Sequence, residues 1–161
     1  MKKEKKEREN STLIPIRGVM LKKLKVNRDY RGNFIEVIRD DWKLLKKIRQ
    51  ISISKTMPGI IKAFHMHKKQ NEAWILLEGK VKIGLCDLRK KSTTNNKKVS
   101  MIMDSNKDPL VLLLPKGVAH GYKVIGKKPC KMLYITDNVY NTKIPDEIRI
   151  PHNDLSIGFK W

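Results

Sequence analysis

Short apolar runs separated by turn residues constrain the fold of this chain more than any other feature. The segment NFIEVIR over 33–39 alternates apolar and polar residues, which is typical of a half-buried strand. Similar runs follow over 48–54, 59–67, 72–79, 80–89, 99–103, 110–115, 119–125 and 131–136. Only DDWKLLKK over 40–47 suggests a short helix, and no longer amphipathic helix is evident. About nine short strands of this kind predict an all-β fold, a sandwich or a barrel.

The length of 161 residues suits one domain with a hydrophobic core. The charged residues 1–10 have no apolar segment behind them, so they do not predict a secretory signal. We expect a disordered, lysine-rich tail over 1–12 and one folded domain over 13–161. The apolar run PLVLLLP is too short to cross a bilayer, so we expect no membrane partner. The final segment is expected to pack across the barrel, with Trp161 as an anchor.

The net charge of +20, from 36 Lys and Arg against 16 Asp and Glu, attracts anions. The lysines are scattered along the chain, and no stretch interleaves them with aromatic residues as a stacking platform would. There is no zinc-finger spacing and no helix-turn-helix pattern, so we expect no specific nucleic-acid partner. Cys86 and Cys130 lie in apolar contexts and are expected to be buried free thiols, as is usual in the cytoplasm.

The segment GIIKAFHMHKKQNEAWILLEG over 59–79 contains two of the four histidines. Residues two apart in a strand lie on the same face. His65 and His67 are therefore expected to point one way, while Phe64 and Met66 point the other way into packing. A strand that presents two imidazoles on one face is a candidate for a metal site or for acid–base chemistry.

Two further side chains can join these histidines. Glu72 opens the next expected strand, and PKGVAHGY over 115–122 supplies His120 after a Pro–Gly turn. Imidazole and carboxylate ligands suit Zn²⁺, Fe²⁺, Mn²⁺ or Ni²⁺, and spacing alone does not choose between these ions. The residues leave two alternatives open. One is a site for a divalent transition metal made by His65, His67, Glu72 and His120, and the other is a metal-free site with a histidine base.

This arrangement resembles the cupins, whose first motif is a glycine, five residues, His-x-His, a few residues, a glutamate, six residues and a glycine. The chain meets that spacing with Gly59, His65, His67, Glu72 and Gly79. The second cupin motif, Pro-x-Gly-x-x-His, is met by PKGVAH, although its trailing asparagine is absent. The resemblance implies a single cupin (jelly-roll) barrel. In metal-bearing cupins the matching histidines and glutamate hold one divalent ion.

A more specific resemblance covers residues 18–161. In order, the segments are DYRGNFIEVIR, RQISIS, GIIKAFHMH, GKVKIGLCDLRKKST, LLLPKGVAHGYKV and LYITDNVYN. They resemble the dTDP-4-dehydrorhamnose 3,5-epimerase family, and most closely a shorter branch without the C-terminal tail. The resemblance implies a nucleotide-sugar isomerase of deoxysugar and surface polysaccharide biosynthesis. It also implies a homodimer and no cofactor.

The same resemblance assigns roles to residues. It implies that His65 is the catalytic base and Tyr134 the acid. The implied substrate-binding residues are Arg31, Glu36, Gln50, Lys62 and His120. Lys62 stands where the family usually has a phosphate-binding arginine, and Glu72 where it usually has a substrate-contacting lysine. The family aspartate that bonds the base lies in a tail beyond Trp161, so the sequence identifies no partner for His65.

These residue types suit epimerisation. A ketone at C4 acidifies the protons at C3 and C5, and inversion needs a base and an acid on opposite sides of the ring. Histidine titrates near neutral pH, and tyrosine, with a pKa of about 10, stays protonated and can donate. The enolate needs cationic support, which Lys62 or His120 could give. The alternatives are a sugar 3,4-ketoisomerase, a metal-binding cupin (an oxygenase or a small-molecule binding module) and a non-catalytic binder of a sugar nucleotide or a polyanion.

Overall fold

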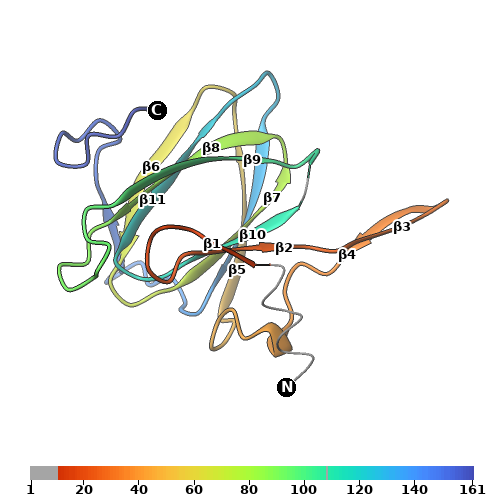
Figure 1. Cartoon of the computed structure of the whole chain (residues 1–161), viewed down its shortest axis with the longest axis horizontal. Coiled ribbons are helices and arrows are strands. Elements are labelled where there is room, and N and C mark those ends of the chain that lie inside the picture. Colours follow the sequence, from red (N-terminus) through yellow and green to blue (C-terminus); the bar gives the residue numbers. More distant parts are fainter. Residues whose placement is uncertain (1–10, 108) are drawn as a thin grey trace.

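The computed structural model describes residues 11–107 and 109–161, and almost all of its regular structure is β (Figure 1). One sheet has six strands in the spatial order β1 (Ser11–Leu13), β2 (Met20–Lys23), β10 (Leu110–Leu114), β7 (Glu72–Glu78), β12 (Cys130–Thr136) and β5 (Gln50–Thr56). The second has five, in the order β13 (Glu147–Arg149), β6 (Ile61–His67), β11 (Val118–Val124), β8 (Lys80–Asp87) and β9 (Lys98–Asp104). A separate hairpin is formed by β3 (Val26–Asp29) and β4 (Gly32–Ile35).

The order of strands in the two sheets is that of a jelly roll. All neighbouring strands pair antiparallel, and sequence-distant strands lie side by side, such as β10 between β2 and β7. In the same way β11 lies between β6 and β8, so the PKGVAHGY segment is hydrogen-bonded beside the His-x-His strand. The prediction of an all-β, single cupin barrel is confirmed.

The main core fills the space between the two sheets. It includes Trp74 and Leu76 of β7, Ile83 and Leu85 of β8, and Tyr122 of β11, all of which are buried. Side chains of an antiparallel strand alternate between its two faces, so each of these strands gives every second residue to this core. These buried side chains form the largest hydrophobic cluster among the described residues.

Two smaller clusters cover the outer faces of the sheets. On the six-stranded sheet, Ala73 and Ile75 pack with Leu45 beneath the segment that follows the hairpin. That cover explains why both faces of β7 are apolar and buried. On the five-stranded sheet, Phe64 packs against the C-terminal segment, where its ring lies 5.2 Å from that of Trp161. The predicted anchoring of the C-terminal segment by Trp161 is confirmed.

Several local expectations differ from the structure. The helix expected over 40–47 is a single 3-10 turn, η1 (Asp40–Trp42), because Lys43 adopts a left-handed conformation with φ 50° and ends it. Residues 1–10 of the expected tail lie outside the described part of the chain. Residues 11 and 12 pair with β2 in strand β1, so regular structure begins before residue 13.

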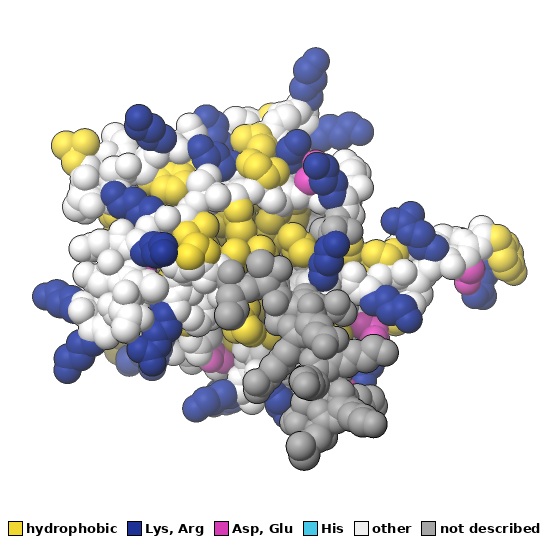
Figure 2. Space-filling model, in the orientation of Figure 1, with side chains coloured by type: hydrophobic (Ala, Val, Ile, Leu, Met, Phe, Trp, Pro, Cys, Tyr) yellow, Lys and Arg dark blue, Asp and Glu magenta, His cyan; other side chains and the backbone are white. Residues whose placement is uncertain are grey.

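The distribution of basic residues and the state of the two cysteines agree with the expectations from the sequence. Figure 2 shows lysines and arginines scattered over the visible face, without a continuous basic stripe. Cys86 and Cys130 are buried free thiols, as predicted. Within residues 11–107 and 109–161, the structure has no helix that is long and apolar enough to cross a membrane.

Candidate active site

A cavity of about 260 Å³ opens between the two sheets. Residues from β5, β6, β7, β11, β12 and β13 line it, together with loop residues near their ends. Of the residues that the sequence assigns to catalysis and substrate binding, those found in its wall are Gln50, Lys62, His65, His120 and Tyr134. His67 and Glu72 also line the cavity. Side chains far apart in the sequence therefore meet in one site.

Arg31 and Glu36 lie elsewhere in the chain. Arg31 is in the turn of the β3–β4 hairpin, which projects away from the barrel (Figure 1). Its guanidinium Nη2 lies 2.7 Å from Oδ2 of Asp29. Glu36 forms an ion pair with Arg39 at 2.7 Å, and neither Arg31 nor Glu36 lines the cavity of its own chain. The role of these two residues in substrate binding stays a prediction.

Strand β6 presents its two histidines as the alternation predicts. His65 and His67 both line the cavity, while Phe64 and Met66 belong to the cluster beneath the C-terminal segment. The strand is held between β11 and β13, with His120 of β11 directly opposite His65. The backbone of both neighbours thus fixes the direction of the two imidazoles.

His65 faces a carboxylate from strand β13. Its Nδ1 lies 3.3 Å from Oε1 of Glu147, and the Nε of Arg149 donates to the same oxygen at 2.6 Å. Burial lowers the pKa of His65, and although the charge of Glu147 opposes this effect, the net shift is downward. The imidazole is therefore neutral near pH 7 and can accept a proton at its other nitrogen.

Tyr134 lies in the six-stranded sheet, within a chain of hydroxyl groups. Its hydroxyl is 2.9 Å from Oγ of Ser54 and 3.0 Å from the hydroxyl of Tyr122. The Tyr122 hydroxyl in turn lies 2.9 Å from Oγ1 of Thr56. Burial and the neighbouring Tyr122 raise the pKa of Tyr134, so its hydroxyl stays protonated and can donate. The candidate base and acid thus come from different sheets.

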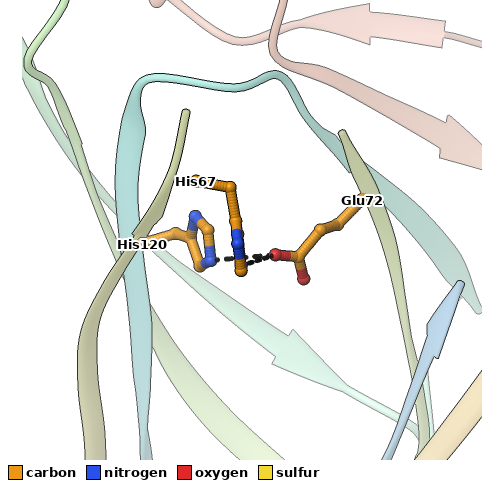
Figure 3. Close-up of side chains that lie close together, drawn as sticks. All are labelled: His67, Glu72 and His120. Atoms are coloured by element: carbon orange, nitrogen blue, oxygen red, sulfur yellow. Dashed lines mark ion pairs between the residues drawn. The ribbon is translucent and has the colours of Figure 1, made fainter. Parts of the chain in front are cut away.

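A second group of side chains lies deeper in the barrel. His67 from β6, Glu72 from β7 and His120 from β11 point toward one another (Figure 3). Oε1 of Glu72 lies 2.5 Å from Nε2 of His67 and 3.4 Å from Nε2 of His120. The indole Nε1 of Trp74 donates to the other carboxylate oxygen at 2.7 Å. All three members of the group are buried, so electrostatic interactions between them are little screened by water.

The electrostatics of this buried group favour charged forms. Burial raises the pKa of Glu72, but the two facing imidazoles reverse this effect and hold the pKa well below its usual range. Burial lowers the pKa of His67, but the carboxylate of Glu72 outweighs it, and the net shift is upward. Without a metal, His67 and Glu72 therefore form a buried ion pair.

The same three residues have the donor atoms of a metal site. One atom each from His67, Glu72 and His120 lie within 4.8 Å of one another. Nδ1 of His120 lies 2.9 Å from the backbone oxygen of Val118, and such second partners orient histidine ligands. His65, the fourth ligand considered from the sequence, is not in this group within the described residues. The arrangement fits a divalent transition metal held by three ligands.

Some residues of the site escaped the sequence analysis. Tyr122 follows His120 by two residues in one strand, so alternation alone would have placed both on the cavity face. Ser54 lies in the β5 segment that was recognised as a strand, but a serine there carries no chemical signal of its own. Glu147 comes from a short edge strand far along the chain from His65. Nothing local in the sequence indicates that these two side chains meet.

The fold and the cavity together define a cupin-type barrel with a candidate acid–base site. Residues 13–161 match the family model described as dTDP-4-dehydrorhamnose 3,5-epimerase. The chain belongs to this family, which is a family of isomerases acting on dTDP-linked sugars. The family and the class of enzyme predicted from the sequence are confirmed.

Two relatives match nearly the whole chain. The spore coat polysaccharide biosynthesis protein SpsL of Bacillus subtilis (strain 168) is 47% identical over 146 residues, which cover 91% of this chain and 96% of the relative. The probable low-salt glycan biosynthesis epimerase Agl13 of Haloferax volcanii is 32% identical over 148 residues, covering 91% and 94%. The crystal structure of the dTDP sugar isomerase from Desulfovibrio desulfuricans G20 superposes with a TM-score of 0.86 at 23% identity, covering 93% and 94% of the two chains. That likeness shows the shared fold.

Proposed function

We propose that this protein is a nucleotide-sugar isomerase that epimerises a dTDP-4-keto-6-deoxy sugar at C3 and C5. The observation that carries the proposal is that His65 and Tyr134 line one cavity from different sheets. Family membership supports the class of substrate, and the 47% identical relative is named for spore coat polysaccharide biosynthesis. We therefore assign the reaction to the synthesis of a surface polysaccharide. The buried free thiols are consistent with an enzyme that works in the reducing cytoplasm.

The geometry supports a two-base route. Neutral His65 removes the proton next to the ketone, and the C–H electrons move into an enolate. Tyr134 then donates its hydroxyl proton to the opposite face of the same carbon, which inverts the centre. Lys62 and His120 line the cavity, and the ammonium of Lys62 supplies positive charge for the enolate oxygen or the diphosphate. Gln50, whose Oε1 accepts from the backbone N–H of Tyr140, completes the substrate-facing wall.

The hairpin supports the proposal of a homodimer. Arg31 and Glu36 lie outside the cavity of their own chain, so they reach a bound nucleotide only if a second chain brings its hairpin there. The hairpin exposes two aromatic side chains, Tyr30 at 96% and Phe34 at 66%, which a partner could cover. Light scattering after size exclusion should give twice the chain mass. A monomer that is fully active would contradict this assembly.

The product of one reaction distinguishes the proposed 3,5-epimerase activity from a 3,4-ketoisomerase activity. We expect dTDP-4-keto-6-deoxyglucose to be converted to the product inverted at C3 and C5, as read by NMR of the sugar protons. A product with the ketone moved to C3 would instead assign a 3,4-ketoisomerase. Recovery of unchanged substrate after prolonged incubation with folded protein would contradict both activities.

A second candidate, a metal-binding cupin, is favoured by one observation. His67, Glu72 and His120 place three suitable donor atoms within 4.8 Å. A divalent ion held there would supply a Lewis acid at the cavity wall. The test is elemental analysis of protein purified without chelator, followed by activity before and after EDTA. One equivalent of Zn, Fe, Mn or Ni that is lost together with activity would favour this candidate, and unchanged activity in EDTA favours the metal-free isomerase.

A further inference from the structure

The carboxylate of Glu147 is the one acidic group within ion-pair range of His65 among the described residues. We infer that Glu147 is the positioning residue of the active site, which holds the His65 ring so that Nδ1 carries the proton and Nε2 faces the substrate. This inference rests on the proposed function, because it concerns the residue assigned there as the base. It adds a residue that the sequence pattern and the family resemblance left without a candidate.

The contact between His65 and Glu147 meets the distance for a hydrogen bond but not the angle. Nδ1 of His65 lies 3.3 Å from Oε1 of Glu147, and this nitrogen is buried. Its hydrogen-bond angle is not met in this conformation, since Nδ1 has no aligned acceptor among the described residues. Catalytic hydrogen bonds are often long or poorly aligned before the substrate binds, and the distance here is within that range.

Glu147 is itself held in place. It lies on β13, which pairs antiparallel with β6 so that Glu147 is opposite His67 and Arg149 is opposite His65. Beyond the strand, Phe64 and Ile150 exchange backbone hydrogen bonds of 2.7 and 2.9 Å. Arg149 donates its Nε–H to Oε1 of Glu147 at 2.6 Å. The carboxylate therefore has a backbone held in the sheet and a charge partner on the same strand, and such second partners orient a side chain.

The neighbouring acid, Asp146, does not compete for this role. Its carboxylate accepts the backbone N–H groups of Lys69 and Gln70 at 3.0 Å, and its closest approach to an imidazole is 3.8 Å, to Nδ1 of His67. Asp146 thus closes the loop after β6, whereas Glu147 reaches the cavity wall. Asp146, which precedes β13, and Glu147, at the start of β13, therefore lie beside different histidines.

The path of the substrate proton shows what Glu147 contributes. His65 takes the substrate proton on Nε2, and the electrons of the broken C–H bond move into the enolate. The imidazole becomes an imidazolium, whose Nδ1–H faces Glu147. The carboxylate takes up no proton and stabilises the new positive charge, as expected of an acid beside a histidine base. Arg149 keeps the carboxylate ionised, since the two side chains share a short bond.

The kinetic test uses the whole chain with dTDP-4-keto-6-deoxyglucose in D₂O. We expect Glu147→Ala to lower kcat for deuterium exchange by about 10²-fold, within the range that a positioned base contributes. The affinity for dTDP should stay at the wild-type value, because Glu147 acts on the base. Glu147→Asp should recover part of the lost rate, because it restores the charge on a shorter side chain. The control is Glu78→Ala, which removes an exposed glutamate paired with Lys131 far from the cavity.

A second readout does not depend on turnover. In ¹⁵N NMR of the neutral ring, wild-type His65 should carry its proton on Nδ1, and Glu147→Ala should give a mixture of tautomers. Wild-type kcat in Glu147→Ala, or a wild-type ring protonated on Nε2, would overturn the inference. If the wild type exchanges no substrate proton, the proposed function fails, and the tautomer measurement still decides the role of Glu147.

Discussion

His65 and Tyr134 line one cavity from different sheets of the barrel. His65 comes from β6 in the five-stranded sheet, and Tyr134 comes from β12 in the six-stranded sheet. A keto sugar between two such side chains can lose a proton to one wall, and the planar enolate that forms can gain a proton from the other. The shift in pKa at each residue suits its role, since burial keeps the imidazole neutral and the phenol protonated.

Substitution of His65 by asparagine should remove activity and keep the fold. Asparagine is polar and fits the space, but it has no nitrogen that can take a proton near neutral pH. We expect kcat to fall by about 10²–10⁴-fold, which is the usual contribution of a general base. The melting temperature should change little, because the site is at the cavity wall. A His65→Asn variant that keeps most of its activity would assign the base to another residue.

The rate should decline on the acid side only at a pH below the ordinary pKa of histidine. The pKa of His65 is lowered from 6.5, mainly by burial, so the ring stays neutral until the pH falls below that value. The rate should therefore be level from about pH 8 down to 6.5 and decline only at lower pH. The measurement is kcat/KM across this range, which reports groups of the free enzyme. A midpoint at or above 6.5 would contradict the assignment.

The His67–Glu72 pair should stabilise the fold in a defined pH window. The pKa of Glu72 is lowered from 4.5, so its contribution is complete above 4.5 and is lost as pH falls through the folded-state pKa. The pKa of His67 is raised from 6.5, so its contribution is complete below 6.5 and is lost as pH rises through its folded-state pKa. The pair therefore contributes most between pH 4.5 and 6.5.

Glu72→Gln tests this window by urea unfolding at several pH values. Because removing one partner leaves the other charge buried, we expect a loss of about 3 kcal/mol in the free energy of unfolding between the two pKa values. The loss should shrink on both sides of the window. Glu78→Gln, at an exposed ion pair with Lys131, is the control and should cost less than about 1 kcal/mol. An equal loss at every pH would argue against the buried ion pair.

The positive charge of the chain should act on a phosphate-bearing ligand rather than on DNA. Lys62 lies in the cavity wall, whereas lysines and arginines are scattered over the face of the molecule that Figure 2 shows. Binding of dTDP should persist at about 0.15 M salt, where charges more than ~8 Å apart are largely screened. Binding of duplex DNA should fall steeply with salt. Equal salt dependence for the two ligands, measured by calorimetry, would indicate that the dTDP site is not specific.

Periodicity and spacing predicted much of this site. Alternation placed His65 and His67 on one face of β6, and the Pro–Gly turn placed His120 beside them; the structure agrees on both points. The direction of the two histidines is a local feature, because a strand of seven residues fixes the direction of each side chain by its position. The resemblance to a family supplied Tyr134, which spacing alone would have left as a core aromatic.

Contacts between residues far apart in the chain could not be predicted from the sequence. The approach of Glu147 to His65 depends on the pairing of a three-residue edge strand with β6, which no local pattern specifies. The position of Arg31 depends on where the hairpin points, and alternation within β3 and β4 does not determine that. The short helix expected over 40–47 was wrong for a local reason, because Lys43 adopts a left-handed conformation that ends the element after one 3-10 turn.

The separation of proton exchange from inversion tests the central claim most directly. Wild-type protein with dTDP-4-keto-6-deoxyglucose in D₂O should incorporate deuterium at C3 and C5, as followed by NMR, and invert both centres. Tyr134→Phe should still exchange, because His65 is intact, but inversion should be lost with the donor hydroxyl. Deuterium at both carbons in the wild type, with exchange and inversion separated in Tyr134→Phe, is the predicted result. The absence of deuterium at either carbon in folded wild-type protein would contradict the account.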